Sequence, residues 1–269
     1  MHLAPATIKK LYAKPEARPR EALRAFRHYL QLPWWQRAVK RGFDIAVSLT
    51  AMILLAPLVP VVAFLIKRDS PGSFIYRQER VGLDRRSGKE RRQSLNEVFG
   101  NDRRRTKSDR RHSVVELDSF VRPQGTPFTL LKLRSMFDDA ESAGVLLTDP
   151  EDPRITRVGR LLRKYRLDEI PQFWNVLRGD MSVVGPRPER AGIIEEMLRG
   201  LRPDYRERLR FKPGITGLAQ VSSGYDTSAF SMSDKLELDV RYINTYSLTQ
   251  DFRICLKTFR VIFTGRGAL

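Results

Sequence analysis

The sequence predicts a mostly α-helical protein with small β elements that is attached to one face of a membrane. The first observation is the apolar stretch 45–66, whose interruption by Pro57 and Pro60 predicts a re-entrant helix-break-helix. The second is a set of basic segments with apolar residues three or four positions apart, typical of amphipathic helices on a membrane surface. The third is the shortness of strand-like stretches such as 212–221. We therefore expect a monotopic membrane protein, which enters the bilayer without crossing it.

The chain is strongly basic and poor in cysteine. Its 269 residues contain 49 Lys and Arg against 31 Asp and Glu, a formal net charge of +18. Such an excess predicts a polyanionic partner, and charge alone does not choose among nucleic acid, anionic membrane lipids and a phosphorylated substrate. The single cysteine excludes a disulfide framework and favours a cytoplasmic catalytic body, and three scattered histidines exclude a zinc site. No signal peptide is recognisable at the start.

The stretch 45–66 is long enough to cross a membrane, but its flanks argue against crossing. At 1.5 Å per residue it would reach about 33 Å, close to the hydrocarbon thickness. Lys40 and Arg41 precede it, and Lys67 and Arg68 follow it. Basic residues mark cytoplasmic ends, so both ends are expected on the cytoplasmic side.

The predicted membrane break lies at Ala56, Pro57 and Pro60. The two prolines remove backbone donors and divide the stretch into arms of about 12 and 6–9 residues, each about half a bilayer long. A proline-kinked transmembrane helix and a buried helix of a soluble core are the alternatives.

The predicted domain organisation has two parts. Residues 1–39 form a basic N-terminal arm and an amphipathic helix, with Trp34 and Trp35 suited to a membrane interface. Residues 40–269 form the catalytic domain, with an Arg-rich insertion at 84–126. In the insertion DRRSGKERR is echoed by DRRRTKSDRR, a weak repeat that we expect to be disordered or exposed. It is open whether the repeat clamps anionic lipid headgroups, binds nucleic acid or is a solvated loop.

The remaining elements are short. They are a helix at 21–41, a strand pair or hairpin at 72–83, a helix, a break and a short helix stopped by Gly179 within 154–189, a helix at 190–210, a turn and strand at 212–221, and a helix at 234–263. The last helix is basic and amphipathic, which suits either a membrane surface or a core-facing helix with a solvated basic side.

The sharpest candidate for chemistry is the pair Asp168 and Glu169. It follows an Arg- and Lys-rich helix and precedes Pro171, which suits the first turn of a new helix. Two carboxylates at a helix junction offer oxygen ligands to a divalent cation, and one oxygen can act as a nucleophile. The turn GPRPE at 185–189 aims Arg187 from a proline-stiffened backbone, as phosphate binding requires. Taken singly, such a pair and such a turn are more often a solvated cap and a plain loop.

In their order and content, these segments resemble one family, the monotopic bacterial phosphoglycosyl transferases of the polyprenyl-phosphate hexose-1-phosphate transferase type. The matching pieces are KRGFD (40–44), FIYRQERVG (74–82), KLRSM (132–136), RLDEIPQFWNVLRGDMSVVGPRP (166–188), KPGITGLAQV (212–221) and LELDVRYI (236–243).

The resemblance implies a two-step, Mg²⁺-dependent reaction. Asp168 would attack the sugar-linked phosphate of a UDP-sugar and release UMP, with Glu169 as its partner at the metal. Polyprenyl (undecaprenyl) phosphate would then accept the phosphosugar. This is the first membrane step of surface polysaccharide or glycoconjugate synthesis, at the cytoplasmic face of the bacterial inner membrane. No nucleic-acid partner is expected.

The resemblance also assigns the surrounding residues. Lys132, Arg163, Arg187 and Arg208 would handle phosphates, and Asp239 and Tyr242 would shape the site. The sequence departs from the family's pattern at the membrane break, where Ala56 replaces the usual serine, and in the Arg-rich insertion. No four-helix membrane region precedes the catalytic part in this sequence. The competing function is a basic membrane- or nucleic-acid-binding protein without activity, against which the intact Asp-Glu pair argues.

Overall fold

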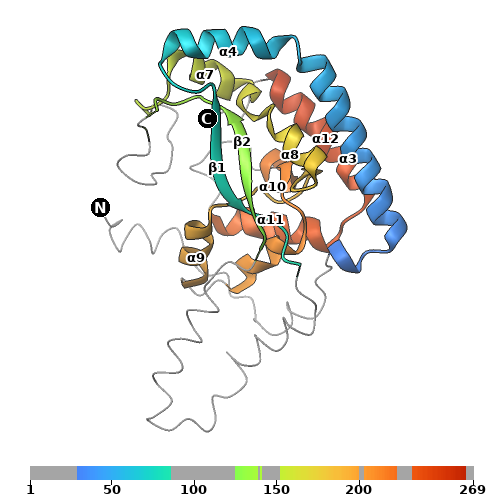
Figure 1. The fold of residues 1–269 in the computed structure, drawn as a ribbon. Helices are drawn as coiled ribbons and strands as arrows, with labels where there is room; N and C mark the ends of the chain where they lie inside the picture. The colour runs from blue at the N-terminus through green and yellow to red at the C-terminus, as the bar shows by residue number, and fades with distance from the viewer. Residues whose placement is uncertain are drawn as a thin grey trace, which may run out of the picture.

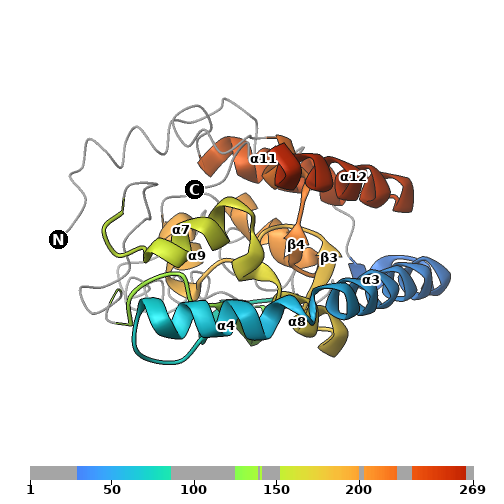
Figure 2. The same cartoon turned by 90° about the horizontal axis from the view of Figure 1, so that it is seen from above.

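The computed structural model describes residues 29–85, 125–138, 140, 152–199, 203–222 and 232–264. The predicted N-terminal arm and most of the Arg-rich insertion lie outside the described residues. Within them, the expected mostly helical fold with small β elements is confirmed. Figure 2 shows helices α3 (Trp34–Leu55) and α4 (Leu58–Asp69) on one side and α11 (Met232–Asn244) and α12 (Leu248–Thr264) on the other, with α7 (Arg157–Lys164) and two short strands between them.

The apolar stretch is broken once, at Ala56 and Pro57. Helices α3 and α4 meet there with a bend of 63° (Figure 1). The expectation that Pro60 breaks the helix again is wrong, because Pro60 lies in the first turn of α4, where backbone N–H groups have no helical partner. Within the stretch 45–66 the two arms span residues 45–55 and 58–66, close to the predicted 12 and 6–9 residues, and α3 and α4 extend beyond the stretch to 22 and 12 residues. By length and composition, no single helix of the described residues could cross a membrane. Helices α3 and α4 taken together are long and apolar enough.

Helix α3 begins earlier than the apolar stretch. It follows Pro33 and runs without interruption from Trp34 through the basic KRGFD segment into the apolar region. The predicted boundary between an amphipathic helix ending near residue 41 and a membrane helix starting at 45 is therefore wrong. Both belong to one helix, preceded by a short 3₁₀ turn, η1 (Tyr29–Gln31).

The strands form two separate pairs. Strand β1 (Ile75–Val81) runs antiparallel to β2 (Pro127–Leu133), with Tyr76 opposite Lys132 and Val81 opposite Pro127. The predicted hairpin within 72–83 is thus wrong, because the partner strand lies beyond the Arg-rich tract. Strands β3 (Ser182–Val184) and β4 (Gly214–Thr216) pair in parallel.

The remaining elements are short helices. They are α7, η3 (Leu167–Glu169), α8 (Gln172–Arg178), α9 (Ala191–Arg199), η4 (Pro203–Arg210), α10 (Leu218–Ser222), α11 and α12. Gly179 ends α8 with φ of 90°, as predicted, because glycine adopts this left-handed conformation without a steric penalty. The helices expected over 190–210 and 234–263 are each divided in two, and the latter breaks between Asn244 and Leu248.

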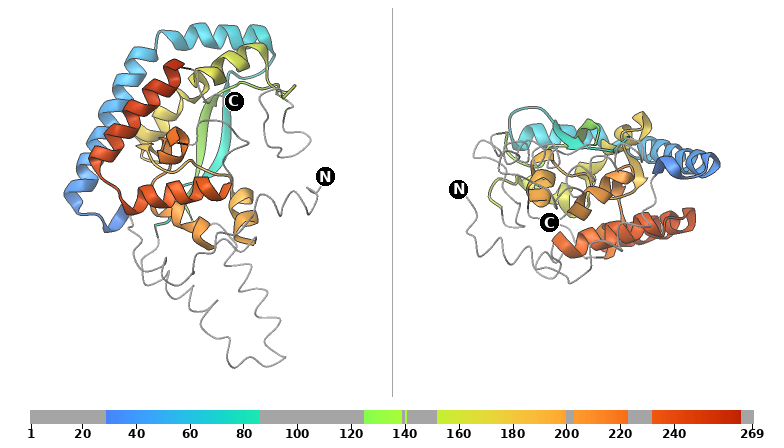
Figure 3. Two further views of the ribbon diagram at one scale, coloured as in Figure 1. Left: turned by 180° about the vertical axis from the view of Figure 1, so that it is seen from behind. Right: turned by 90° about the horizontal axis from the view of Figure 1, so that it is seen from below.

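The largest buried cluster joins segments that are far apart in sequence. Val176 and Val184 pack with Phe211 and Tyr242, so α8, β3, the segment after η4 and α11 share one core. Seen from behind in Figure 3, α12 overlaps α3 and runs in nearly the same direction, and Figure 2 shows that the two helices lie in separate layers.

A buried ion pair connects α3 to α12. Lys40, only 1% exposed, places Nζ 2.6 Å from Oδ2 of Asp251 and donates a second hydrogen bond to the carbonyl of Val184 at 3.1 Å. Asp251 also accepts a hydrogen bond of 2.7 Å from the Tyr242 hydroxyl. Lys40 thus joins α3 to β3 and α12, and Asp251 adds α11 through Tyr242.

Two further side chains of α3 bind the body. Asp44 accepts hydrogen bonds from the Ser182 hydroxyl and the Val183 amide, both at 2.9 Å. Arg41 donates to the carbonyls of Val176 and Leu177 in the last turn of α8, at 2.5 and 2.6 Å. The basic and acidic residues of KRGFD therefore hold α3 in place.

The far end of α4 is held as well. The Arg134 guanidinium donates to the carbonyls of Ser70 and Pro71 at 2.6 and 2.5 Å, and Asp69 accepts from the Val158 amide at 2.9 Å. Because Val158 lies in the first turn of α7, the end of α4 is bonded to the helix that leads to Asp168.

Removing the Lys40 ammonium should destabilise the fold. Lys40→Ala leaves Asp251 buried without its cation, and breaking such a pair costs about 3–5 kcal/mol. We expect a lower Tm for the purified protein in detergent or nanodiscs. The control is Arg253→Ala, which removes an exposed cation of α12 and should change the free energy of unfolding by less than about 0.5 kcal/mol. Equal Tm values for the two variants would contradict the structural role of the pair.

Candidate active site

The Asp168–Glu169 pair lies on η3, between α7 and α8. Both side chains are buried at 7% exposure, although each carries a carboxyl group. Ile170 and then Pro171, the N-cap of α8, follow the pair, which confirms that it stands at a helix junction. Carboxyl groups are seldom buried without compensating partners, so their neighbours determine what they can do.

The backbone before the pair is strained. Arg166 adopts φ 55° and ψ 23°, and it is the only non-glycine residue with positive φ in the described ranges. This left-handed conformation costs an ordinary side chain about 1–2 kcal/mol and persists only where the surroundings impose it. It turns the chain from α7 into η3, and Arg166 itself places NH1 3.7 Å from Oε2 of Glu169.

Two more cations reach the pair from separate elements. Lys132 on β2 places Nζ 3.6 Å from Oδ2 of Asp168 and 3.3 Å from Oε1 of Glu169. NH1 of Arg187, on the turn after β3, lies 3.5 Å from the same Glu169 oxygen. The structure therefore brings together four of the residues that the sequence singles out.

Arg163 lies one step further from the carboxylates. It stands in the last turn of α7, and Nε donates to the Ser135 hydroxyl at 2.9 Å. Burial lowers the pKa of Arg163, and the charge of Asp168 opposes that shift. The charge of Arg163 lowers the pKa of Asp168, and the Ser135 hydroxyl, just after β2, orients its guanidinium.

The two carboxyl groups differ in their proton affinity. Burial raises the pKa of Asp168, and the charge of Glu169 adds to this effect against Lys132 and Arg163. Burial would also raise the pKa of Glu169, but Lys132, Arg187 and Arg166 together lower it below the usual value. Glu169 is thus held as a carboxylate, while Asp168 is the more basic partner and accordingly the better nucleophile.

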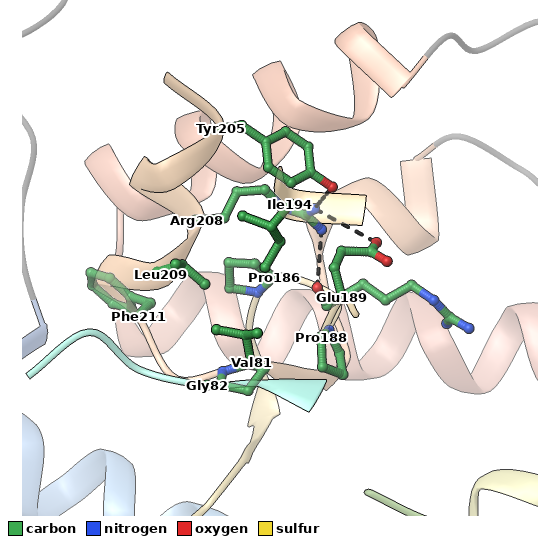
Figure 4. A pocket seen from close by; sticks show the side chains of 12 residues that line it. Val81, Gly82, Pro186, Pro188, Glu189, Ile194, Tyr205, Arg208, Leu209 and Phe211 are labelled. Atoms are coloured by element: carbon green, nitrogen blue, oxygen red, sulfur yellow. Dashed lines mark hydrogen bonds and ion pairs between the residues drawn. The ribbon is translucent and has the colours of Figure 1, made fainter. Parts of the chain in front are cut away.

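The other residues assigned by the resemblance lie in two further clusters. Arg208 is buried, with Nε 2.8 Å from Oδ2 of Asp239 and NH1 3.6 Å from Oε1 of Glu189. Figure 4 shows Arg208 extending between Tyr205 and Glu189, at a small, largely apolar pocket behind the Gly-Pro-Arg-Pro turn. Burial raises the pKa of Asp239 to about 6 against the opposing charge of Arg208.

Tyr242 belongs to the cluster around Lys40. Its hydroxyl donates to Asp251 at 2.7 Å and lies 3.2 Å from the carbonyl of Val184. Tyr242 therefore contacts the residue at the end of β3, from which the chain enters the turn that carries Arg187. Within the described ranges, its hydroxyl bonds to Asp251 and Val184 and not to Asp168 or Glu169.

The sequence predicts no role for Arg80, and it places Arg166 only among the arginines near the carboxyl pair. Arg166 is the first residue of RLDE, and its position two residues before Asp168 is the local signal for a role at the pair. Arg80 lies in FIYRQERVG and donates to the carbonyl of Pro188 at 3.1 Å. This contact spans more than a hundred residues, so no local pattern could reveal it.

The carboxylate pair suits a magnesium ion that is shared with a substrate. In the described part of the chain, no three His, Cys, Asp or Glu side chains converge on one point. Mg²⁺ commonly takes one or two protein carboxylates and completes its shell with water and substrate phosphates. Asp168 and Glu169 fit that donor set. The remaining coordination positions of the ion would go to water and to a phosphorylated ligand, whose charge the surrounding cations would balance.

Comparison with known proteins agrees with the motifs. The profile of the bacterial sugar transferase family matches residues 35–91 and 104–265. The unmatched residues between these blocks fall within the Arg-rich tract. The match includes the Asp168–Glu169 pair, Lys132 and Arg187.

Several curated proteins are similar to this chain in sequence. A UDP-N-acetylgalactosamine-undecaprenyl-phosphate N-acetylgalactosaminephosphotransferase of Aeromonas hydrophila is 37% identical over 230 residues, which cover 86% of this chain and 45% of that protein. A UDP-glucose:undecaprenyl-phosphate glucose-1-phosphate transferase of Caulobacter vibrioides is 34% identical over 231 residues, covering 85% of this chain and 71% of that protein. Another of that name, from Escherichia coli, is 33% identical and is covered over 42% of its length.

The chain thus spans less than half of two of these relatives and about seven tenths of the third. In each case the similarity extends over most of the present chain. By the extent of the family match and by these identities, the chain belongs to the bacterial sugar transferase family.

Proposed function

We propose that this protein transfers a sugar-1-phosphate from a UDP-sugar to polyprenyl (undecaprenyl) phosphate through a covalent aspartyl-phosphosugar intermediate. The observation that carries the proposal is the buried Asp168–Glu169 pair with Lys132, Arg166 and Arg187 at 3.3–3.7 Å. The names of the relatives from three bacteria supply the class of donor and acceptor.

In the first step a carboxylate oxygen of Asp168 attacks the phosphorus that carries the sugar. A bond forms between this oxygen and phosphorus, and the bond from phosphorus to the bridging oxygen of the diphosphate breaks. The electron pair leaves with UMP. The basic character that burial gives to Asp168 favours this attack.

In the second step a phosphate oxygen of polyprenyl phosphate attacks the same phosphorus. The bond to the Asp168 oxygen breaks, which restores the carboxylate and releases the polyprenyl-diphosphate sugar. Each step exchanges one oxygen–phosphorus bond for another, so no oxidant or further co-reactant is required.

The cations around the pair hold the phosphates and balance their charge. Lys132 and Arg187 each lie within 3.6 Å of a carboxylate oxygen, so a phosphate bound beside the pair would lie within their reach as well. In phosphoryl transfer most of the rate enhancement comes from such positioning and charge stabilisation. Asp168 and Glu169 would hold Mg²⁺, which supplies further neutralisation of the diphosphate when bound.

The protein would act at the cytoplasmic face of the bacterial inner membrane. The bent α3–α4 pair exposes large apolar side chains on both arms, including Ile53, Leu54 and Phe64. Helix α12 buries Asp251 and Ile254 but exposes a stripe of Phe252, Leu256 and Phe259 beside a basic stripe. Exposed apolar and basic stripes on one helix fit contact with anionic membrane lipids. The re-entrant pair would place a soluble UDP-sugar and a lipid phosphate at the same site.

Loss of the nucleophile should abolish the reaction. Asp168→Asn keeps the size of the side chain but removes the attacking carboxylate, and we expect UMP release to fall at least about 10³-fold. The assay uses purified membranes with a panel of UDP-sugars and undecaprenyl phosphate, and it includes Asp180→Asn, an aspartate outside the pair, as the matched control. No UMP release by the wild type, or release unchanged in Asp168→Asn, would refute the proposed function.

Removal of divalent cations should stop the transfer. With EDTA in excess we expect the loss of UMP release, and added Mg²⁺ should restore it, because the carboxylate pair alone repels the diphosphate. Glu169→Gln should raise the Mg²⁺ concentration needed for half-maximal activity. Full activity in EDTA would show that the pair works without a metal ion.

Labelling of single cysteines tests the topology. In a Cys255→Ser background, cysteines placed at Ala38 and Arg68, which are exposed on α3 and α4, should both react with a membrane-impermeant maleimide only from the cytoplasmic side. Both flanks carry basic residues, and a re-entrant pair returns to the side from which it entered. Labelling from opposite sides would instead establish a kinked transmembrane helix.

A further inference from the structure

The turn that carries Arg187 has every backbone carbonyl from residue 186 to 189 hydrogen-bonded. The donors come from three separate parts of the chain. The bonds are Gly214 amide to Pro186 (2.8 Å), Arg208 NH2 to Arg187 (3.0 Å), Arg80 NH1 to Pro188 (3.1 Å) and Val81 amide to Glu189 (3.0 Å). With two prolines fixing φ as well, this turn has little conformational freedom.

Two of these four bonds come from arginines of different elements, of which Arg208 is buried and Arg80 is half-buried. Arg208 on η4 binds the carbonyl of Arg187, and Arg80 on β1 binds the next carbonyl along the chain. Glu189 connects the two guanidinium groups, with its oxygens 3.7 Å from Arg80 NH1 and 3.6 Å from Arg208 NH1. The two arginines therefore bind the carbonyls of Arg187 and of Pro188, the residue after it.

The two guanidinium groups are committed to this framework. The charge of Arg208 is balanced by Asp239 at 2.8 Å and by Glu189. Arg80 is bonded to Pro188 and Gln78 as well as paired with Glu189. Among the described residues, the ion pairs of Asp168 and Glu169 involve neither arginine, whereas Arg187 reaches Glu169 and keeps 41% of its side chain exposed.

We propose that Arg80 and Arg208 are positioning residues, which act on the reaction through Arg187 by fixing the turn that aims its guanidinium at the carboxylate pair and the substrate phosphates. This inference rests on the proposed function. It gives Arg80 a role that its motif alone does not suggest, and it replaces the expected phosphate contact of Arg208 by a contact with the backbone of the phosphate-binding residue.

A double-mutant cycle between Arg80 and Arg187 tests the proposal. Misplacement of a catalytic group by about 1 Å can cost about 100-fold in rate, so Arg80→Ala should lower kcat/KM for the UDP-sugar by tens-fold to about 100-fold. In the Arg187→Ala background, the same substitution should cost no more than about twofold, because the group it positions is absent. Equal losses in both backgrounds would overturn the proposal.

The controls separate positioning from folding. Arg77→Ala removes an exposed arginine from the same strand and should leave kcat/KM unchanged. Arg80→Lys keeps the charge beside Glu189 and one donor, so it should recover part of the activity. If Arg80→Ala does not fold, Arg80→Lys carries the cycle under the same criterion, judged by whether its loss disappears in the Arg187→Ala background.

The same cycle is measured in the Kd of UDP by titration calorimetry. A wild type that binds UDP but transfers no sugar, with a non-additive cycle in Kd, would refute the proposed function and leave the positioning role standing. Additive losses in an enzyme that transfers the sugar would refute the positioning role and leave the proposed function standing. A wild type that neither binds UDP nor releases UMP would refute both.

Discussion

The buried ion pair between Lys40 and Asp251 is the contact on which the arrangement of the whole molecule depends. A charge removed from water is tolerated only if partners satisfy it, and Lys40 finds them on β3 and α12 together. Its position therefore fixes the apolar helix α3 against the same strand that leads to Arg187. The apolar helix and the strand that precedes the Arg187 turn are thereby held together by one ammonium group, with contacts added by the adjacent Arg41 and by Asp44 one turn further along α3.

The site shows how adjacent carboxyl groups of one 3₁₀ turn acquire different properties. Asp168 and Glu169 are equally buried, yet cations lie on both oxygens of Glu169 and mainly on one side of Asp168. The strained conformation of Arg166 contributes to this difference, because it brings a guanidinium back onto Glu169. The local backbone and the charge distribution thus act together to make Asp168 the more basic of the two carboxyl groups.

Local features of the sequence predicted local features of the structure. The break at Pro57, the stop at Gly179 and the helix junction at Asp168 each depend on a few neighbouring residues, and each is confirmed. Pro60 does not break the helix as expected, because the effect of a proline depends on its distance from the start of a helix, and α4 starts at Leu58. The pairing of β1 with β2 and the contact from Arg80 to Pro188 join segments separated by 40 or more residues, and no local pattern encodes such contacts. The grouping of Lys132 and Arg187 with the pair came from the family resemblance, and the geometry now gives it a physical basis.

The register of β1 and β2 has a consequence for how this enzyme family can diversify. The Arg-rich tract joins the strands at the end where Val81 faces Pro127, while Lys132 faces Tyr76 near the opposite end. Lys132 lies five positions after Pro127 on β2, about 17 Å along the strand. Hydrogen bonds from Gly82 to Thr126 and from Thr126 to Leu83 close the ladder at the point of entry. A connection of almost any length can therefore replace the Arg-rich tract at this end of the strands without moving Lys132. This position is thus suited to new recognition segments and to the fusion of reporter domains.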